Sequence, residues 1–264
     1  MKAALCRGLS LPGGRSLHRF AQQRLTRSLR PATDLKDYRD HRDALLKHAG
    51  TLDGVLYEFG AGWHLSSQIA MWCYGVPRQI AVDIEPLAQP ELVQATIRTF
   101  SGMNDPHFVR TPSPAARLED LGVEYRAPAD PGASALPEHS VDYVISTHTL
   151  EHIPPEDIRR IMLECRRICR PGGVLSMTID YSDHYSHADP TISRVNFLRF
   201  SDRQWKPYQS RMLYQNRLRH SDYRRLFEES GLRVIYESRM VLEEESRAVQ
   251  RMPLADRFAG YELE

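Results

Sequence analysis

Short apolar runs alternate with amphipathic stretches along most of the 264 residues. Runs rich in β-branched and aromatic residues predict six strands, at residues 55–59, 79–83, 123–127, 141–146, 174–179 and 232–240. Apolar positions three and four apart predict helices between them, at residues 37–49, 66–74, 90–100, 115–121, 155–169 and 221–230. This alternation indicates one α/β domain with a doubly wound, mostly parallel sheet and helices on both faces.

Two glycines follow the first predicted strand. Gly60 and Gly62 allow the backbone to turn sharply and to come close to a ligand, as in loops that receive nucleotide-type cofactors. Asp83 ends the second strand, roughly 20 residues further on, where a carboxylate can accept hydrogen bonds from ribose hydroxyls. A nicotinamide dinucleotide would require Gly or Ala three residues after Gly62, and Leu65 stands there. An NAD(P)-dependent oxidoreductase and a catalytically silent cofactor-binding module remain as alternatives.

Five motifs, in this order and at these spacings, resemble those of the class I S-adenosylmethionine-dependent methyltransferases. They are Glu58-Phe59-Gly60-Ala61-Gly62, Asp83, Leu136-Pro137 before Ser140-Val141-Asp142, Leu150-Glu151-His152 and Arg170-Pro171-Gly172-Gly173. The resemblance covers about residues 50–240, and the run 216–223 is similar to a segment of an uncharacterised bacterial branch of the family. It implies a Rossmann-like fold, S-adenosyl-L-methionine as the cofactor, and methyl transfer.

The resemblance also implies which residues hold the cofactor. They are Glu58, Gly60, Ala61, Gly62, His64, Asp83, Ile84, Asp130, Ala133, Ser146 and Thr147. Two positions depart from the common family pattern, because His64 replaces a third glycine and Gly132 replaces an acid that receives the adenine amine. We therefore expect His64 to crowd or contact the carboxylate end of the cofactor, and Asp130 or the backbone near Ala133 to bind adenine.

The expected reaction is methyl transfer to a small or medium polar acceptor, with oxygen favoured over nitrogen. An oxygen acceptor must lose its proton near the transition state, and histidine has the unperturbed pKa that best suits this at neutral pH. His152 follows the fourth predicted strand and His184 follows the fifth, and these strands are expected to be neighbours. The hypothesis is that His152 acts as the base, that Glu151 or Asp180 orients it, and that His184 binds the acceptor.

Histidines and acids after the fifth strand raise the question of a metal. His184 and His187 lie close in sequence to Asp183 and Asp189, and histidine with carboxylate suits zinc or iron. The stretch lacks a helix or hairpin register that would bring these side chains together. We therefore expect acceptor contacts there and no metal.

Composition and charge limit the partners. Hydrophobic residues make up 41% and charged residues 26% of the chain, the formal net charge is +1, and no apolar run is long enough to span a bilayer. We therefore expect a cytoplasmic protein that acts on a small molecule and not on nucleic acid. Cys165 and Cys169 share an apolar helical stripe, which favours a core role over metal binding and fits a reducing compartment. Composition does not predict the oligomeric state.

Three segments depart from the alternation, and the methyltransferase domain is expected at residues 37–242. Residues 1–36 form a basic arm, a composition shared by transit peptides, by helices that touch membranes peripherally and by arms that pack beside a cofactor pocket. Residues 181–220 are rich in aromatic side chains and are expected to form a lid. The tail, residues 243–264, has no β-branched run, so the family's last antiparallel strand should be missing and residues 254–264 should be helix or coil.

Overall fold

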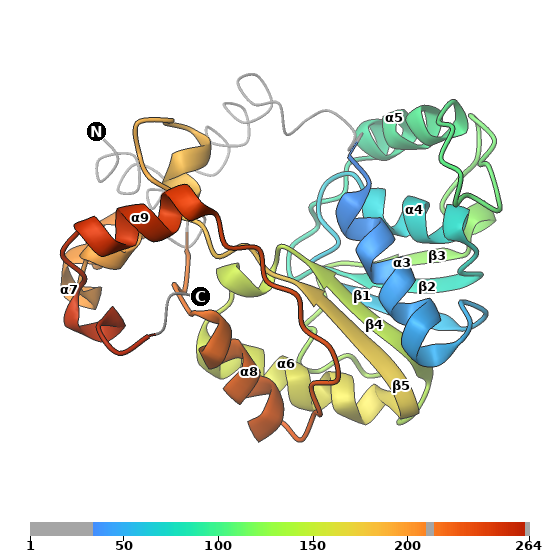
Figure 1. The fold of residues 1–264 in the computed structure, drawn as a ribbon. Coiled ribbons are helices and arrows are strands. Elements are labelled where there is room, and N and C mark those ends of the chain that lie inside the picture. The colour runs from blue at the N-terminus through green and yellow to red at the C-terminus, as the bar shows by residue number, and fades with distance from the viewer. Residues whose placement is uncertain (1–33, 210–213, 262–264) are drawn as a thin grey trace. The chain divides into compact units, whose positions relative to one another are not determined.

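The computed structural model describes residues 34–209 and 214–261, so the predicted basic arm falls almost wholly outside the described residues. The described chain divides into two compact units (Figure 1). The sheet unit consists of residues 34–150 and 160–179, and the second unit consists of residues 151–159 and 180–261. Each unit has a hydrophobic core of its own, as a compact folding unit should.

Five parallel strands form the sheet, in the order β3-β2-β1-β4-β5. They are β1 (Val55–Phe59), β2 (Arg78–Val82), β3 (Val123–Arg126), β4 (Val141–Thr147) and β5 (Cys169–Thr178). The chain order reverses between β1 and β4, and open α/β sheets bind ligands at the carboxyl ends of the strands on either side of such a reversal. The predicted Rossmann-like, doubly wound sheet is confirmed.

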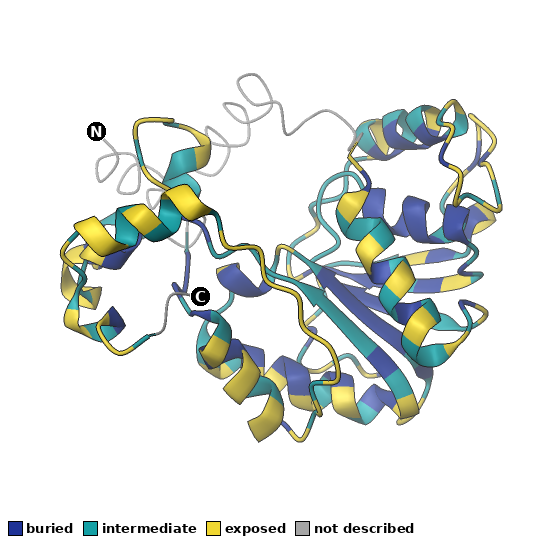
Figure 2. Ribbon diagram, viewed as in Figure 1, coloured by how far each residue is buried: buried dark blue, intermediate teal, exposed yellow. Residues whose placement is uncertain are grey.

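Helices cover both faces of the sheet (Figure 1). On one side lie α3 (Lys36–Ala49), α4 (Ser66–Tyr74) and α5 (Pro90–Ser101), and on the other lie residues 160–168 of α6 (Pro155–Ile168). Figure 2 shows β1 and β4 buried along most of their length, because both faces of these strands are covered. The helices α3 and α5 turn apolar residues to the core and polar residues to water, whereas α4 is buried along almost its whole length.

The predicted sixth strand, at residues 232–240, is wrong, since these residues form no regular secondary structure. Ile235, Tyr236 and Met240 are 52%, 57% and 77% exposed. A β-branched run becomes a strand only where a neighbouring strand takes up its backbone hydrogen bonds, and no described strand does so here. The described part of the tail, residues 243–261, contains helix and coil and no strand, as expected.

Two predicted boundaries also differ. β5 begins at Cys169 and not at residue 174, because the Pro-Gly-Gly stretch bulges out of the ladder: Cys169 is paired with Val141, and Val174 with Tyr143. The helix predicted at residues 115–121 is reduced to a 3-10 turn, Glu119–Leu121, that Gly122 ends in the left-handed conformation. In so short a segment, too few hydrogen bonds form to offset the unfavourable free energy of helix nucleation.

The second unit contains an aromatic core, short helices and 3-10 turns. The helices are α7 (Asp202–Trp205), α8 (His220–Glu229) and α9 (Glu243–Arg251), with 3-10 turns at His184–His187, Asn196–Arg199, Lys206–Tyr208 and Asp256–Phe258. The buried residues of the core come from the predicted lid and from the tail: Val195, Phe197, Leu198, Trp205 and Phe258. The aromatic side chains of the lid segment therefore pack on one another and on the tail, and the role of the segment as a lid stays a prediction.

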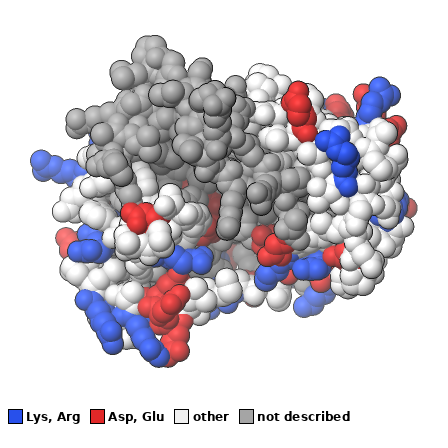
Figure 3. All heavy atoms as spheres, turned by 90° about the horizontal axis from the view of Figure 1, so that it is seen from above, with Lys and Arg blue, Asp and Glu red and all other residues white. Residues whose placement is uncertain are grey.

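Charged side chains of both signs are interspersed on the face drawn in Figure 3. Among the described residues, no helix is long and apolar enough to cross a membrane. The basic arm, whose residues would make any peripheral membrane contact, lies outside the described residues, so that contact stays a prediction.

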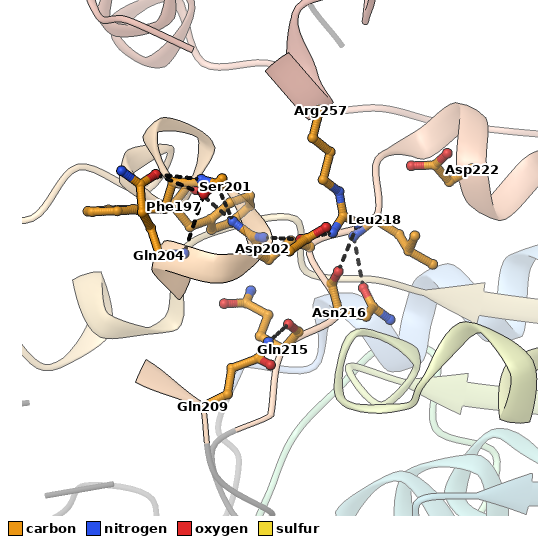
Figure 4. A network of polar contacts seen from close by, with 12 residues as sticks. Phe197, Ser201, Asp202, Gln204, Gln209, Gln215, Asn216, Leu218, Asp222 and Arg257 are labelled. Atoms are coloured by element: carbon orange, nitrogen blue, oxygen red, sulfur yellow. Dashed lines mark hydrogen bonds and ion pairs between the residues drawn. The ribbon is translucent and has the colours of Figure 1, made fainter. Parts of the chain in front are cut away.

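Arg217 holds the aromatic core of the second unit together. Its buried guanidinium donates hydrogen bonds to the carbonyls of Phe197 (3.2 Å) and Phe200 (2.6 Å) and to the carboxylate of Asp202. Arg257 of the tail donates to the same carboxylate (Figure 4). Burial lowers the pKa of Arg217 to about 10, so the side chain stays charged at neutral pH. The run 216–223, singled out by its resemblance to one branch of a family, thus includes a structural hub.

Candidate functional site

The loop after β1 folds back onto the end of β2. The amides of Gly60 and Ala61 donate to the carbonyl of Val82, with N···O distances of 2.9 and 3.4 Å. Gly60 and Gly62 have φ angles of 77° and 74°, in the left-handed region where glycine has no steric cost. A Cβ at Gly60 would lie 2.3 Å from Thr149 Oγ1, whereas a Cβ at Gly62 would meet no atom within 4 Å. Packing therefore requires the first glycine, and the second leaves open space beside the backbone.

Asp83 follows β2 directly and points at this loop. Its Oδ2 accepts a hydrogen bond of 2.8 Å from the Gly62 amide. The side chain is buried, and burial raises its pKa to about 6 although the amides of Gly62 and Ile84 act in the opposite direction. The structure thus places a buried carboxylate beside the glycine loop, where the sequence predicts the ribose acceptor.

Glu58, near the end of β1, is buried beneath the first turn of α4. Its Oε2 accepts hydrogen bonds from Ser67 Oγ (2.8 Å) and Gln68 Nε2 (2.5 Å). Its pKa is raised to about 8, mainly by burial; the charge of Asp83 acts in the same direction, and the hydrogen bond from Ser67 opposes both. The side chain therefore braces α4 against β1, and together with Asp83 it forms a pair of buried acids that favours a cationic or hydrogen-bond-donating ligand.

Glu58→Gln is expected to raise the free energy of unfolding at pH 8 by on the order of a few kcal/mol. Burial lifts the folded-state pKa of Glu58 from 4.5 to about 8, so the folded protein keeps a proton that the unfolded chain releases. From this group alone, wild-type stability should fall by about 1.4 kcal/mol per pH unit across that window. The glutamine oxygen can still accept from Ser67 and Gln68. Urea unfolding at several pH values checks this, and parallel pH profiles for the two proteins would contradict it.

Other predicted cofactor residues lie next to the glycine loop, residues 60–62, in the chain or on the strand beside β1. His64 and Ala61 are half-buried, and Ile84, the residue after Asp83, is 64% exposed. Ser146 is buried in β4, and its hydroxyl donates to the carbonyl of Phe59 at the end of β1 (3.2 Å). Ser146 therefore ties β1 to β4 at the point where the strand order reverses.

Asp130 is engaged with neighbouring groups through both carboxylate oxygens. Oδ2 accepts from Arg160 (2.7 Å) and Oδ1 accepts from the Gly132 amide (2.8 Å), and the bond with Arg160 lowers the pKa of Asp130. The Ala133 amide donates to the carbonyl of Asp130 (3.0 Å). These bonds hold the loop 130–133 in a tight turn, and its contact with adenine stays a prediction.

The sequence analysis missed the part that α3 plays in the same unit. His41 is buried, with Nδ1 2.8 Å from Ser176 Oγ and Nε2 3.2 Å from the hydroxyls of Thr147 and Thr178. Burial lowers the pKa of His41 to about 4, so the ring is neutral. One helical turn earlier, Asp37 lies 3.0 Å from His148 Nε2.

These contacts anchor the segment after β4 to the first helix. The signal was present in the chain, because Asp37, His41 and the apolar Leu45 are four residues apart and lie on one helical face. A histidine on an apolar face of a helix indicates a buried polar contact with the neighbouring element.

In the second unit, Glu151, His152 and His184 form a cluster. One ligand-capable atom from each lies within 4.8 Å of the others, and the two histidine rings have centroids 4.8 Å apart. His152 Nδ1 lies 3.0 Å from the carbonyl of Tyr214, which assigns the proton to Nδ1 and leaves the lone pair on Nε2. Glu151 is buried, His152 is exposed and His184 is half-buried. The three residues that the sequence analysis named as catalytic are thus brought together.

The remaining candidates near this cluster differ in their surroundings. Asp180 Oδ2 lies 3.5 Å from Nε2 of both His184 and His187. Asp183 is buried and accepts hydrogen bonds from the Tyr185 amide and from an asparagine side chain, so it caps a turn. Asp189 caps the next turn in the same way. Of the acids first weighed as metal ligands with His184, neither Asp183 nor Asp189 joins the cluster.

Comparison with known families gives one match. Residues 105–177 match the model of a family described as a methyltransferase domain. The matched stretch begins before β3 and includes β4, α6 and most of β5. No curated protein has a detectably similar sequence.

Comparison with solved structures gives several matches of low identity. The PH0226 protein of Pyrococcus horikoshii OT3 has 15% identity and a TM-score of 0.48, over 80% of this chain and 88% of that chain. A complex of the Haloferax volcanii Trm112 methyltransferase activator with a putative methyltransferase gives 18% identity and a TM-score of 0.44, over 83% and 82%. A putative sarcosine dimethylglycine methyltransferase of Galdieria sulphuraria gives 18% and 0.43, over 75% and 61%. Similarity at this level says nothing about the substrate.

Proposed function

We propose that this chain, which carries a class I S-adenosylmethionine-dependent methyltransferase domain, transfers the methyl group to an oxygen of a small or medium polar acceptor. The match to the methyltransferase family supports the reaction, and the cluster of Glu151, His152 and His184 supports the oxygen acceptor. Methyl transfer to oxygen requires removal of a proton, whereas an unprotonated amine needs no such group.

The residues of the sheet unit fit S-adenosylmethionine. The open space at Gly62 lets the cofactor approach the loop backbone, and Asp83 can accept hydrogen bonds from both ribose hydroxyls. Glu58 and Asp83 are buried acids with raised pKa values, so a ligand that carries an ammonium and a sulfonium group would relieve their mutual repulsion. His64, which follows the loop, is proposed to contact the carboxylate end.

The donor supplies a methyl group on a positively charged sulfur, which is already a strong electrophile. What remains for the protein is to align the acceptor oxygen with the methyl carbon and sulfur, to exclude water and to remove the acceptor proton. We assign the last task to the Glu151–His152–His184 cluster, because the ligand-capable atoms of the three residues converge and the His152 ring, whose Nδ1 donates to the carbonyl of Tyr214, is exposed. Asp180, 3.5 Å from His184, would orient that ring.

A calorimetric panel of S-adenosylmethionine, S-adenosylhomocysteine, NAD and NADP, followed by an acceptor screen, tests the proposal. The first two should bind and the dinucleotides should not. Methyl transfer to hydroxyl compounds should exceed transfer to matched amines. Binding of NAD or NADP alone would favour an oxidoreductase, and cofactor binding without turnover on any acceptor would favour a silent module; either result overturns the proposal.

Asp83→Ala is expected to weaken S-adenosylhomocysteine binding by about 1.5–3 kcal/mol, the usual range for hydrogen bonds to a charged group. The domain should stay folded, because the Asp83 side chain contributes one hydrogen bond to the glycine loop and its raised pKa shows that burial of its charge is unfavourable. Glu124→Ala, which removes an exposed carboxylate of β3, serves as the control and should leave affinity unchanged. Calorimetry measures both variants, and wild-type affinity in Asp83→Ala would exclude the ribose assignment.

A further inference from the structure

We infer that Glu151, His152 and His184 bind a divalent transition-metal ion such as Zn²⁺. The inference rests on the proposed function and deepens it, because it gives the catalytic cluster a cation through which to act. The set offers two imidazoles and one carboxylate, with ligand atoms within 4.8 Å of one another. This mixture suits zinc and neighbouring metals, whereas magnesium and calcium prefer oxygen ligands throughout.

The three ligand atoms must move only slightly closer together to bind one metal ion. Zinc bonds to nitrogen and oxygen of about 2.0–2.2 Å place tetrahedral ligands roughly 3.4 Å apart, so the three atoms must approach by on the order of 1 Å. Glu151 is buried and fixed, whereas His152 is exposed and His184 is half-buried. The two imidazole rings can therefore turn toward the carboxylate without disturbing the core.

The neighbours of the cluster hold it in the way that metal ligands are held. His152 directs Nδ1 to the carbonyl of Tyr214 (3.0 Å), and metal-binding histidines commonly donate their second ring nitrogen to such a group. Asp180 contributes twice, since its amide lies 3.4 Å from Glu151 Oε1 and its carboxylate lies 3.5 Å from His184 Nε2. His152 thus has a carbonyl partner, Glu151 has an amide partner, and His184 lies beside a carboxylate.

Three protein ligands leave coordination positions for water or for an acceptor hydroxyl. A hydroxyl bound to the cation releases its proton to solvent more readily, since zinc lowers the pKa of bound water to about 7. The oxygen then bonds to the methyl carbon as the carbon–sulfur bond breaks, and the donor leaves as S-adenosylhomocysteine. In this arrangement His152 is a metal ligand and the released proton goes to water.

Calorimetric titration of the EDTA-treated full chain with Zn²⁺ tests the inference, and the visible absorption of Co²⁺ in the same site gives a second readout. One ion per chain is expected. His152→Ala, His184→Ala and Glu151→Gln should each weaken binding about 100-fold or more, because loss of a group that only orients a metal ligand already costs about 10–100-fold. Circular dichroism and S-adenosylhomocysteine binding verify that each variant is folded.

Two histidines serve as controls. His187→Ala removes a ring that stacks on His184 but is outside the cluster, and His107→Ala removes an exposed histidine of the sheet unit. Both should bind Zn²⁺ as the wild type does. Absence of binding in the wild type, binding that survives loss of both His152 and His184, or loss of binding in His187→Ala overturns the inference. Since the titration needs neither donor nor acceptor, its failure would leave the methyltransferase proposal standing.

Discussion

His152→Ala is expected to lower methyl-transfer turnover by about 10²–10⁴-fold, the range for loss of a group that assists proton removal. The substitution removes the exposed imidazole that is proposed to take part in activating the acceptor hydroxyl. Affinity for S-adenosylhomocysteine should be nearly unchanged, because the glycine loop, Asp83 and Glu58 are untouched. Steady-state kinetics with the acceptor found in the screen, and calorimetry of the product, measure the two effects separately.

His187→Ala is the matched control for this experiment as well. Its ring stacks on His184 with centroids 5.1 Å apart and belongs to the same 3-10 turn, yet it lies outside the cluster. Turnover of this control should be close to wild type. If His152→Ala retained full activity, the acceptor would need no activation at this cluster. If it lost cofactor affinity, His152 would belong to the wall of the cofactor pocket.

Gly60→Ala should mainly lower stability, whereas Gly62→Ala should mainly weaken binding. Both positions have left-handed φ angles, which cost an alanine about 1–2 kcal/mol. At Gly60 the new methyl group would also lie 2.3 Å from Thr149 Oγ1, and overpacking of this kind costs about 1–3 kcal/mol more. Gly60→Ala should therefore lower the free energy of unfolding by about 2–5 kcal/mol, from the sum of these two costs.

Gly62→Ala should lower stability only by the smaller backbone cost, since its Cβ meets no protein atom within 4 Å. It should nevertheless weaken S-adenosylhomocysteine binding, because the methyl group occupies space left for the ligand. Adding Thr149→Gly to Gly60→Ala should restore part of the lost stability, as a double-mutant cycle in urea can measure. Additive effects of the two substitutions would show that Thr149 is not the obstacle.

The strands that were predicted correctly are those that have a neighbouring strand to pair with in the sheet. Residues 55–59 and 141–146 are mostly apolar runs, and they lie side by side in the middle of the sheet. The run 232–240 has the same local composition, but strand formation depends on a neighbouring backbone, and no local signal reports whether one is present. At Cys169 a strand begins earlier than predicted. The pairing with β4 extends past a Pro-Gly-Gly stretch whose residue types are typical of the end of an element.

The proximity of Asp83 to the glycine loop could be predicted from the sequence more fully than the contacts in the rest of the candidate site. Glycine spacing and the position of Asp83 are tied to the strand ends, so their proximity follows from the topology alone. The contacts of His41 and Asp37 could not be read in the same way, because they depend on how α3 rotates against β4 and β5. The proximity of Glu151 to His184 could not be predicted for a similar reason, because these residues meet through the fold of the second unit and not through nearness in the chain.

The share of the tail in the aromatic core limits how far the chain can be shortened for expression. Phe258 is one of the buried rings of that core, Arg257 reaches Asp202, and the Tyr261 hydroxyl donates to Asp222 at 2.8 Å. A protein cut after residue 242 would keep the whole aromatic segment but expose rings that now pack against the tail. Contiguous apolar surface of this kind promotes aggregation. Shortened forms intended for crystallisation should therefore end no earlier than Tyr261.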